Sequence, residues 1–295
     1  MFDTKTTSPR SVVDALRVCR TRWAQCVAIA CVAMLVACSS VQTTKPGLIG
    51  IDREQSMSSL VSESELEQGA AQAYTQIIGE AKAQGTLNTN SKMTARVRTI
   101  ATRLIPHVGA FRDDARNWDW QVNVLQSDDL NAWAMPGGRI AFYSGIIETL
   151  NLTDAEIAAI MGHEIAHALR EHSRERASEQ AVTSLITQGG AIIGSALSGY
   201  DLTGLTQPAQ MVAQLTFGLP NSRLHETEAD RIGVELAARA GFDPRAAISV
   251  WQKMAKLSGG KSGPEFLSTH PSNESRISDL QIYSQKVMGL YQQAS

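Results

Sequence analysis

His163-Glu164-Ile165-Ala166-His167 is the stretch around which this 295-residue chain can be interpreted. On an α-helix its two histidines lie four residues apart on one face, about one turn from each other. Two neutral imidazoles at that spacing can bind one metal ion from one side. A helix is predicted because Thr153 and Glu156 form a capping-box pattern before a run of apolar residues at helical spacing. Gly162 costs roughly 1 kcal/mol against Ala inside that helix, which predicts a close backbone neighbour there.

The five residues form an HExxH motif, which is typical of zinc peptidases. In such sites the two histidines bind the metal and the glutamate acts as the general base. The same pattern also occurs by chance as two surface histidines beside an exposed acid. A catalytic zinc needs three protein ligands and one open position, so the choice depends on a third ligand elsewhere in the chain.

The residues that directly follow the motif do not supply that ligand. Glu171 lies too far along the helix axis from His163, and His172 falls on the opposite face, so both are expected to be solvated. The metzincin pattern is excluded because it requires Gly at 170 and His at 173, where this chain has Arg170 and Ser173.

A second helix over residues 221–233 is the candidate source of the third ligand. Glu226 and Asp230 share one face there, so Glu226 can bind zinc while Asp230 accepts a hydrogen bond from a ligating histidine. Glu228 points away from that face and is expected to be solvated, and His225 is a competing ligand. An exposed acidic helix start, favoured by the helix dipole, is the alternative interpretation.

Residues 1–37 predict an export signal rather than part of the fold. Four arginines precede an apolar run of 12 residues, Cys26 to Ala37, which is too short to span a bilayer comfortably. Leu35-Val36-Ala37-Cys38 resembles the bacterial lipobox, so Cys38 is expected to be lipidated; a plain membrane anchor or an ordinary signal peptide is the alternative. Ser39 after the cysteine predicts the periplasmic face of the outer membrane.

Composition narrows the class of protein further. All four cysteines lie in the first 38 residues, which excludes a disulfide framework and a cysteine-ligated zinc from the folded body. Removing residues 1–37 takes five of 27 basic and two of 29 acidic residues, leaving 22 and 27 and a net charge of −5. A basic stripe is lacking, so no nucleic-acid partner is expected.

The remaining chain divides into a flexible tether at 38–60 and a single domain at 61–290. Helices are predicted from residue 62 to about 85 and from 91 to 106, and strands over 118–125 and 139–144 with a turn at 131–138. The strands form either an ordinary hairpin or an edge strand at the rim of a cleft, where an extended peptide can pair. The glycine-rich stretch 180–219 forms either a mobile lid or packed helices with loose joints.

Four motifs together carry a resemblance to a known family. They are HEIAH at 163–167, ETEAD at 226–230, NAxxxPGG at 131–138, and Ser268-Thr269-His270-Pro271 with Arg276. Over residues 60–285 the chain resembles the gluzincin metallopeptidases that include HtpX and the CAAX prenyl endopeptidases. It is closest to the periplasmic lipoprotein branch, similar to the peptidase domain of the β-barrel assembly-enhancing protease but without its helical-repeat tail.

The resemblance implies an α+β fold, a mainly helical zincin-like domain with a small β-sheet whose edge strand borders the active-site cleft. It implies one zinc ion bound by His163, His167 and Glu226, with Glu164 as the general base and Asp230 behind a ligand. His270 is expected near the open coordination position, where it donates to the oxyanion or binds the metal; a surface histidine is the alternative. The residues expected to bind substrate are Asn131, Ala132, Gly137, Gly138, Arg139 and Ile140.

The expected function is zinc-dependent endopeptidase action in envelope protein quality control. The substrates would be peptides or unfolded and misassembled envelope proteins, met by an enzyme anchored to the membrane through lipid. The alternative is a chaperone-like or binding factor for outer-membrane protein assembly whose proteolysis is latent. A purely structural zinc is disfavoured because a glutamate base and an open fourth position serve no structural purpose.

Overall fold

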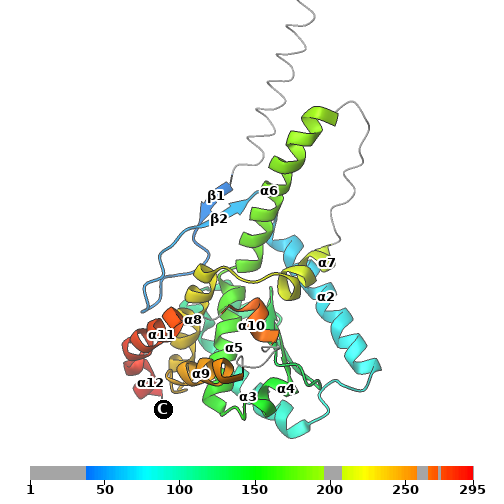
Figure 1. Cartoon of the computed structure of the whole chain (residues 1–295). Helices are drawn as coiled ribbons and strands as arrows, with labels where there is room; N and C mark the ends of the chain where they lie inside the picture. The colour runs from blue at the N-terminus through cyan, green and yellow to red at the C-terminus, as the bar shows by residue number, and fades with distance from the viewer. Residues whose placement is uncertain (1–37, 196–207, 258–264, 272–273, 295) are drawn as a thin grey trace, which may run out of the picture.

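The structure, a computed structural model, describes residues 38–195, 208–257, 265–271 and 274–294 (Figure 1). This part is mainly helical with two small sheets, which confirms the predicted fold class. The strands are β1 (Cys38–Val41), β2 (Gln55–Ser58), β3 (Gln121–Leu125), β4 (Ala132–Met135) and β5 (Arg139–Tyr143). The α-helices are α2 (Glu63–Ala83), α3 (Ser91–Leu104), α4 (Ser144–Thr149), α5 (Asp154–Leu169), α6 (His172–Ser195), α7 (Pro208–Ala213), α8 (Arg223–Arg239), α9 (Ala246–Leu257), α10 (Glu265–Thr269), α11 (Glu274–Lys286) and α12 (Met288–Ala294). The short helices are η1 (Ile105–Ala110), η2 (Asp114–Asn117) and the π-helical η3 (Gln214–Gly218).

The two helices predicted to carry the site begin at polar caps. Helix α5 starts after Thr153, whose side chain accepts from the backbone of Glu156 while the Glu156 carboxylate accepts from the Thr153 N–H at 2.8 Å. This reciprocal pair is the predicted capping box, and it satisfies two otherwise unpaired groups. Helix α8 starts after Ser222, whose hydroxyl accepts from the His225 N–H at 3.1 Å.

A three-stranded sheet lies between α2 and α5, with strand order β3-β5-β4. Strands β3 and β5 are parallel, and β4 pairs with β5 in an antiparallel hairpin. The predicted strands are therefore not joined as a hairpin, and the predicted turn at 131–138 contains the strand β4. The chain reverses direction between β4 and β5 within residues 136–138. Gly137 and Gly138 allow this tight turn because their φ angles are 78° and 88°, where glycine is favoured. Strand β4 is one of the two edge strands of this sheet, and β3 is the other.

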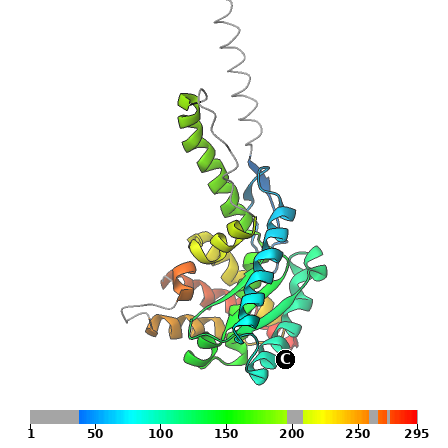
Figure 2. The same cartoon turned by 90° about the vertical axis from the view of Figure 1, so that its right-hand side faces the viewer.

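The sheet separates two apolar clusters. Along β5, Ile140 and Phe142 point to the cluster shared with α3 and α5, whereas Ala141 points to the cluster shared with α2. Figure 2 shows α2 crossing one face of the sheet. This alternation is the period-2 pattern of a strand buried on both faces. Strand β4 lies beside α5.

Helices α5 and α8 cross with their backbones in contact at two glycines. A Cβ added at Gly162 would lie 2.8 Å from the carbonyl oxygen of Gly233, and one added at Gly233 would lie 2.7 Å from the backbone nitrogen of His163. The close backbone neighbour predicted for Gly162 is thereby confirmed. Figure 1 shows α8 alongside α5 at the centre of the molecule. Because the axes approach so closely, side chains on α8 reach those on α5.

The N-terminal segment is not the flexible tether that was expected. Strands β1 and β2 pair in antiparallel register, with Cys38 opposite Ser58. Ile49 and Ile51 between them are 3% and 4% exposed and belong to the main core. The segment lacks any periodic pattern because its anchors are single residues in an irregular loop. The boundary predicted at residue 61 therefore does not separate ordered from structureless chain.

Helix α6 extends away from the body, α7 packs against α2, and η3 contacts α6 and α7 (Figure 1). The described parts of the stretch predicted as a lid or as packed helices are thus helical, while its residues 196–207 lie outside the described residues, as do residues 1–37. Within the described ranges no helix combines the length and apolar character needed to cross a membrane.

Adding a methyl group at the helix crossing tests whether the glycine contact sets the distance between α5 and α8. Gly162→Ala and Gly233→Ala are each expected to lower the free energy of unfolding by about 1–3 kcal/mol through overpacking. Gly79→Ala in α2, where a Cβ meets nothing within 4 Å, should instead stabilise by up to about 1 kcal/mol. Urea unfolding of the three variants measures the difference. Equal effects at the three positions would contradict the crossing.

Candidate metal centre

Four buried side chains from three elements converge on one point. His163 and His167 come from α5, Glu226 from α8 and His270 from the residue after α10, and one ligand atom of each lies within 4.8 Å of the others. The two Nε2 atoms of His163 and His167 are 3.1 Å apart, and Glu226 Oε1 lies 3.3 Å from His167 Nε2. His270 Nδ1 lies 3.0 Å from Glu226 Oε1. Two helices and a loop thus bring together residues far apart in the sequence.

The donor atoms fit a cation in their midst. The Nδ1 of His163 is 2.9 Å from Asp230 Oδ1, and a carboxylate can only accept, so Nδ1 carries the proton. In the neutral ring Nε2 then carries no proton, and its lone pair points toward the ligand atoms of the other donors. Lone pairs directed at one another are unfavourable without a positive charge between them. Three imidazoles and one carboxylate are the nitrogen and oxygen ligands that zinc takes.

Arg276 secures the carboxylates of this group from behind. Its Nε and Nη2 donate to the two oxygens of Asp230, each at 2.7 Å, and its Nη1 lies 2.7 Å from Glu226 Oε2. Burial would raise the pKa of Asp230, but Arg276 and His163 outweigh it and lower that pKa. The sequence identified Arg276 only as part of a motif; the structure gives it this contact.

Glu164 lies beside the donor group at the wall of a cleft. Its Oε1 is 3.4 Å from His270 Nε2 and has no hydrogen-bond partner among the described residues. Burial raises the pKa of this carboxyl above its ordinary value. The space within the cleft, open solvent included, is about 390 Å³. Its lining includes β4, the two site helices and the loops near them, with Asn131, Ala132, Trp133, Ala134, Glu164, His167, Ser173, Arg176, Thr216, Asn221, Thr269 and His270.

The six residues expected to bind substrate divide into two groups. Asn131 and Ala132 line the cleft, whereas Gly137, Gly138, Arg139 and Ile140 do not. Ile140 is fully buried in the core and belongs to β5, whose two edges are both paired. The expectation for Ile140 is therefore wrong. The other three form or follow the hairpin turn, away from the cleft.

The expectation that Glu171, His172 and Glu228 are solvated is also wrong. They are 9%, 0% and 3% exposed. Glu171 and His172 do not continue the motif helix, because α5 stops at Leu169, Glu171 has a φ of 50° and α6 starts at His172. Glu228, on α8, is buried because it binds Arg53 and Arg170. The change of direction brings His172 Nδ1 to 2.8 Å from His167 Nδ1. His225, the competing ligand, stays outside the donor group and contacts Glu175 at 3.0 Å.

A family comparison agrees with this geometry. The model of peptidase family M48 matches residues 91–284. The chain belongs to peptidase family M48. M48 enzymes are metallopeptidases that use zinc, and the histidine and glutamate donors described above are suited to that ion.

Relatives of this M48 chain include mitochondrial and bacterial proteins. The mitochondrial metalloendopeptidase OMA1 of Saccharomyces cerevisiae is 32% identical over 182 residues, which make up 59% of this chain and 50% of the yeast protein. The beta-barrel assembly-enhancing protease of Escherichia coli K12 is 27% identical over 212 residues, or 69% of this chain and 41% of that protein. Its counterpart in Yersinia pestis is 31% identical over 196 residues, or 63% and 38%. The chain thus matches half or less of the length of these relatives.

Zinc binding is expected to release a proton from His163. Burial lowers the pKa of this ring, but hydrogen bonds to Asp230 and Glu226 outweigh burial and raise the pKa to about 9 in the metal-free site. The imidazolium is then populated below pH 9, and a metal ion must displace the proton. Calorimetry at about pH 7.5 in two buffers with different heats of ionisation should show about one proton released per ion.

Asp230→Asn provides the control for this measurement, because it removes one of the two carboxylate charges that raise the pKa of His163. Proton release should decrease in that variant. Identical binding heats in both buffers for the unchanged chain would contradict the prediction.

Proposed function

We propose that this chain is a zinc-dependent endopeptidase. The observation that carries the proposal is the Glu164 carboxylate, buried and without a hydrogen-bond partner at Oε1 within the described structure, beside four convergent metal donors and at the wall of a cleft. His163, His167 and Glu226 would hold the ion. The chemistry that zinc supplies when bound is acidification of a water molecule and polarisation of the scissile carbonyl.

Glu164 carries the proton in this mechanism. Its free Oε1 takes a proton from the attacking water and delivers it to the nitrogen of the leaving amine. A group that acts first as base and then as acid works best when its pKa is near the working pH. Burial moves the pKa of Glu164 in that direction.

The edge strand β4 is suited to hold the substrate. A peptide in extended form can add to β4 as a further strand, which places its backbone along the cleft beside Glu164. Two residues that line the cleft, Trp133 and Asn221, each have a buried polar atom, Nε1 and Oδ1, without a hydrogen-bond partner in the described residues.

His270 lies on the side of the donor group that the substrate approaches. Its ring stacks on Phe266 with centroids 4.2 Å apart. From there its Nε2 can donate to the oxyanion, or the ring can bind the metal and hold the enzyme inactive.

Substitution of the base tests the proposal. Glu164→Gln should retain zinc, because the donors are untouched, and should lower cleavage of fluorescently labelled denatured casein at least about 100-fold. Glu179→Gln, on the exposed side of α6, should behave as the unchanged chain. Turnover preserved in Glu164→Gln would end the mechanism. Envelope function restored in vivo by Glu164→Gln would instead favour the chaperone-like alternative.

The chain is further proposed to act on misassembled envelope proteins from the periplasmic face of the outer membrane, anchored through Cys38. Support comes from the lipobox pattern before Cys38 and from the name of the Escherichia coli relative, which associates that protein with β-barrel assembly.

The anchor is testable by changing Cys38 to Ala. The variant is expected to leave the membrane fraction and to lack acyl chains by mass spectrometry. Cys31→Ala, within the predicted apolar run, is the matched control and should stay acylated. Acylation that persists in Cys38→Ala would refute the anchor.

A further inference from the structure

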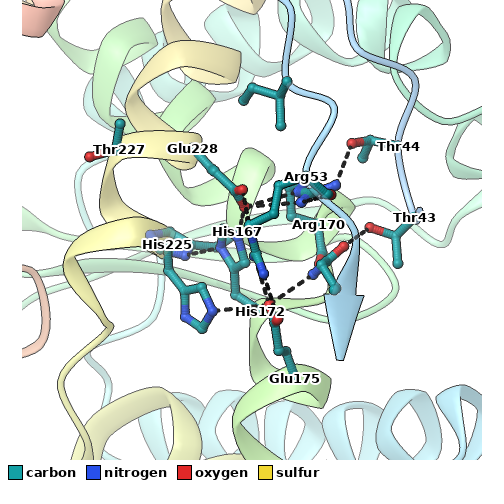
Figure 3. A network of polar contacts seen from close by, with 12 residues as sticks. Thr43, Thr44, Arg53, His167, Arg170, His172, Glu175, His225, Thr227 and Glu228 are labelled. Atoms are coloured by element: carbon teal, nitrogen blue, oxygen red, sulfur yellow. Dashed lines mark hydrogen bonds and ion pairs between the residues drawn. The ribbon is translucent and has the colours of Figure 1, made fainter. Parts of the chain in front are cut away.

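A second buried network lies behind the donor group, and it includes a residue from the N-terminal segment. Arg53 precedes β2 and falls outside the residues that the M48 model matches. Its guanidinium lies between two carboxylates (Figure 3). Nε and Nη2 donate to Glu228 at 2.6 and 3.0 Å, and Nη1 and Nη2 donate to Glu175 at 2.7 and 2.9 Å. Such a double bidentate arrangement requires the planar fork of arginine.

The network reaches the donor group through His172. Glu228 Oε2 lies 3.1 Å from His172 Nε2, and His172 Nδ1 lies 2.8 Å from His167 Nδ1. Because a carboxylate accepts, Nε2 of His172 carries the proton and its Nδ1 is the acceptor. The proton of His167 is then on Nδ1, which leaves Nε2 bare on the side of the other donors. Arg53 and Glu228 therefore determine the tautomer of His167 through one intervening ring.

The network is closed and its charges balance. Two guanidiniums, Arg53 and Arg170, face two carboxylates, Glu175 and Glu228, and both carboxylate side chains are at most 5% exposed. The N-terminal segment adds neutral contacts, since Arg170 Nη1 donates to Thr44 Oγ1 at 3.1 Å and Arg170 Nη2 donates to the carbonyl of Arg53 at 3.0 Å. Buried groups held by this many partners have little freedom to turn.

We propose that Arg53 is a positioning residue of the metal centre, acting on His167 through Glu228 and His172. The proposal rests on the proposed role of His167 as a zinc ligand. On the other side of the site, Arg276 binds Asp230, and Asp230 accepts a hydrogen bond from His163. Each histidine of the motif is therefore oriented by a hydrogen-bonded chain that ends in an arginine. The support of His167 comes from the segment that starts at Cys38, so the same stretch of chain leads to the proposed anchor and completes the site.

The test measures zinc affinity of the full chain by competition with a chromophoric chelator, together with the visible absorption of the Co²⁺-substituted protein. Arg53→Ala and His172→Leu should each weaken zinc binding about 10–100-fold and alter the Co²⁺ spectrum, as loss of an outer hydrogen bond does. His172→Asn should recover most of the affinity, since its carbonyl oxygen can accept from His167 Nδ1. Arg53→Lys should lie between, because an ammonium cannot bridge both carboxylates.

Arg231→Ala is the matched control. The Arg231 side chain is 28% exposed against 26% for Arg53, and it makes a bidentate pair with Asp279 away from the donor group. It should lose stability in urea but bind zinc as the unchanged chain does.

Two results would separate the possible failures. Unaltered zinc affinity and Co²⁺ spectra in Arg53→Lys and His172→Leu would overturn the positioning role, even if Arg53→Ala does not fold. Absence of zinc binding by the unchanged chain would instead overturn the proposed metal centre itself.

Discussion

The contact between Gly162 and Gly233 is the constraint on which the site depends. Backbone atoms of α5 and α8 touch there, and any side chain at either position would separate the helices. Glu226 and Asp230 lie on α8 within two turns of that contact, and His163 follows it directly on α5. A metal ligand must be placed to within a few tenths of an ångström. The glycine crossing provides that accuracy by making the two helices one rigid unit.

Burying so many ionisable groups has a large desolvation cost, which the chain offsets behind the two motif histidines by pairing carboxylates with arginines. Isolated buried ions are strongly unfavourable, whereas paired and hydrogen-bonded ones can be retained where geometry matters more than stability. Arg276 compensates the carboxylates behind His163, and Arg53 and Arg170 compensate those behind His167. Arg53 and Arg276 are far apart in the sequence, on either side of the motif helix, so the centre is complete only when the whole domain has folded.

The sheet positions the substrate side of the site in a comparable way. Strand β4 has only four residues and begins directly after Asn131, so alternation along the sequence is too short to reveal it. Its position as the edge follows from the parallel pairing of β3 with β5, which places β5 in the centre. Strands β3 and β5 pair although β4 lies between them in the sequence, and no local sequence pattern specifies their register.

The sequence alone determined the elements whose signals are local. The capping residues Thr153 and Glu156, the histidines one turn apart and the paired acids of 226–230 predict two helices with one functional face each. It also predicted a close neighbour at Gly162, because a glycine inside a helix needs a reason.

Only the tertiary structure decided which of the remaining polar residues belong to the site. Arg53, His172 and Glu228 look like ordinary surface residues in the sequence, and His172 and Glu228 were expected to be solvated. Arg276 was visible only as part of a motif, without its contacts. Their roles depend on a helix end at Leu169, a left-handed residue at 171 and an irregular N-terminal segment that folds back. These features are set by long-range packing and by the pairing of buried charges. Neither produces a periodic pattern in the sequence from which it could be predicted.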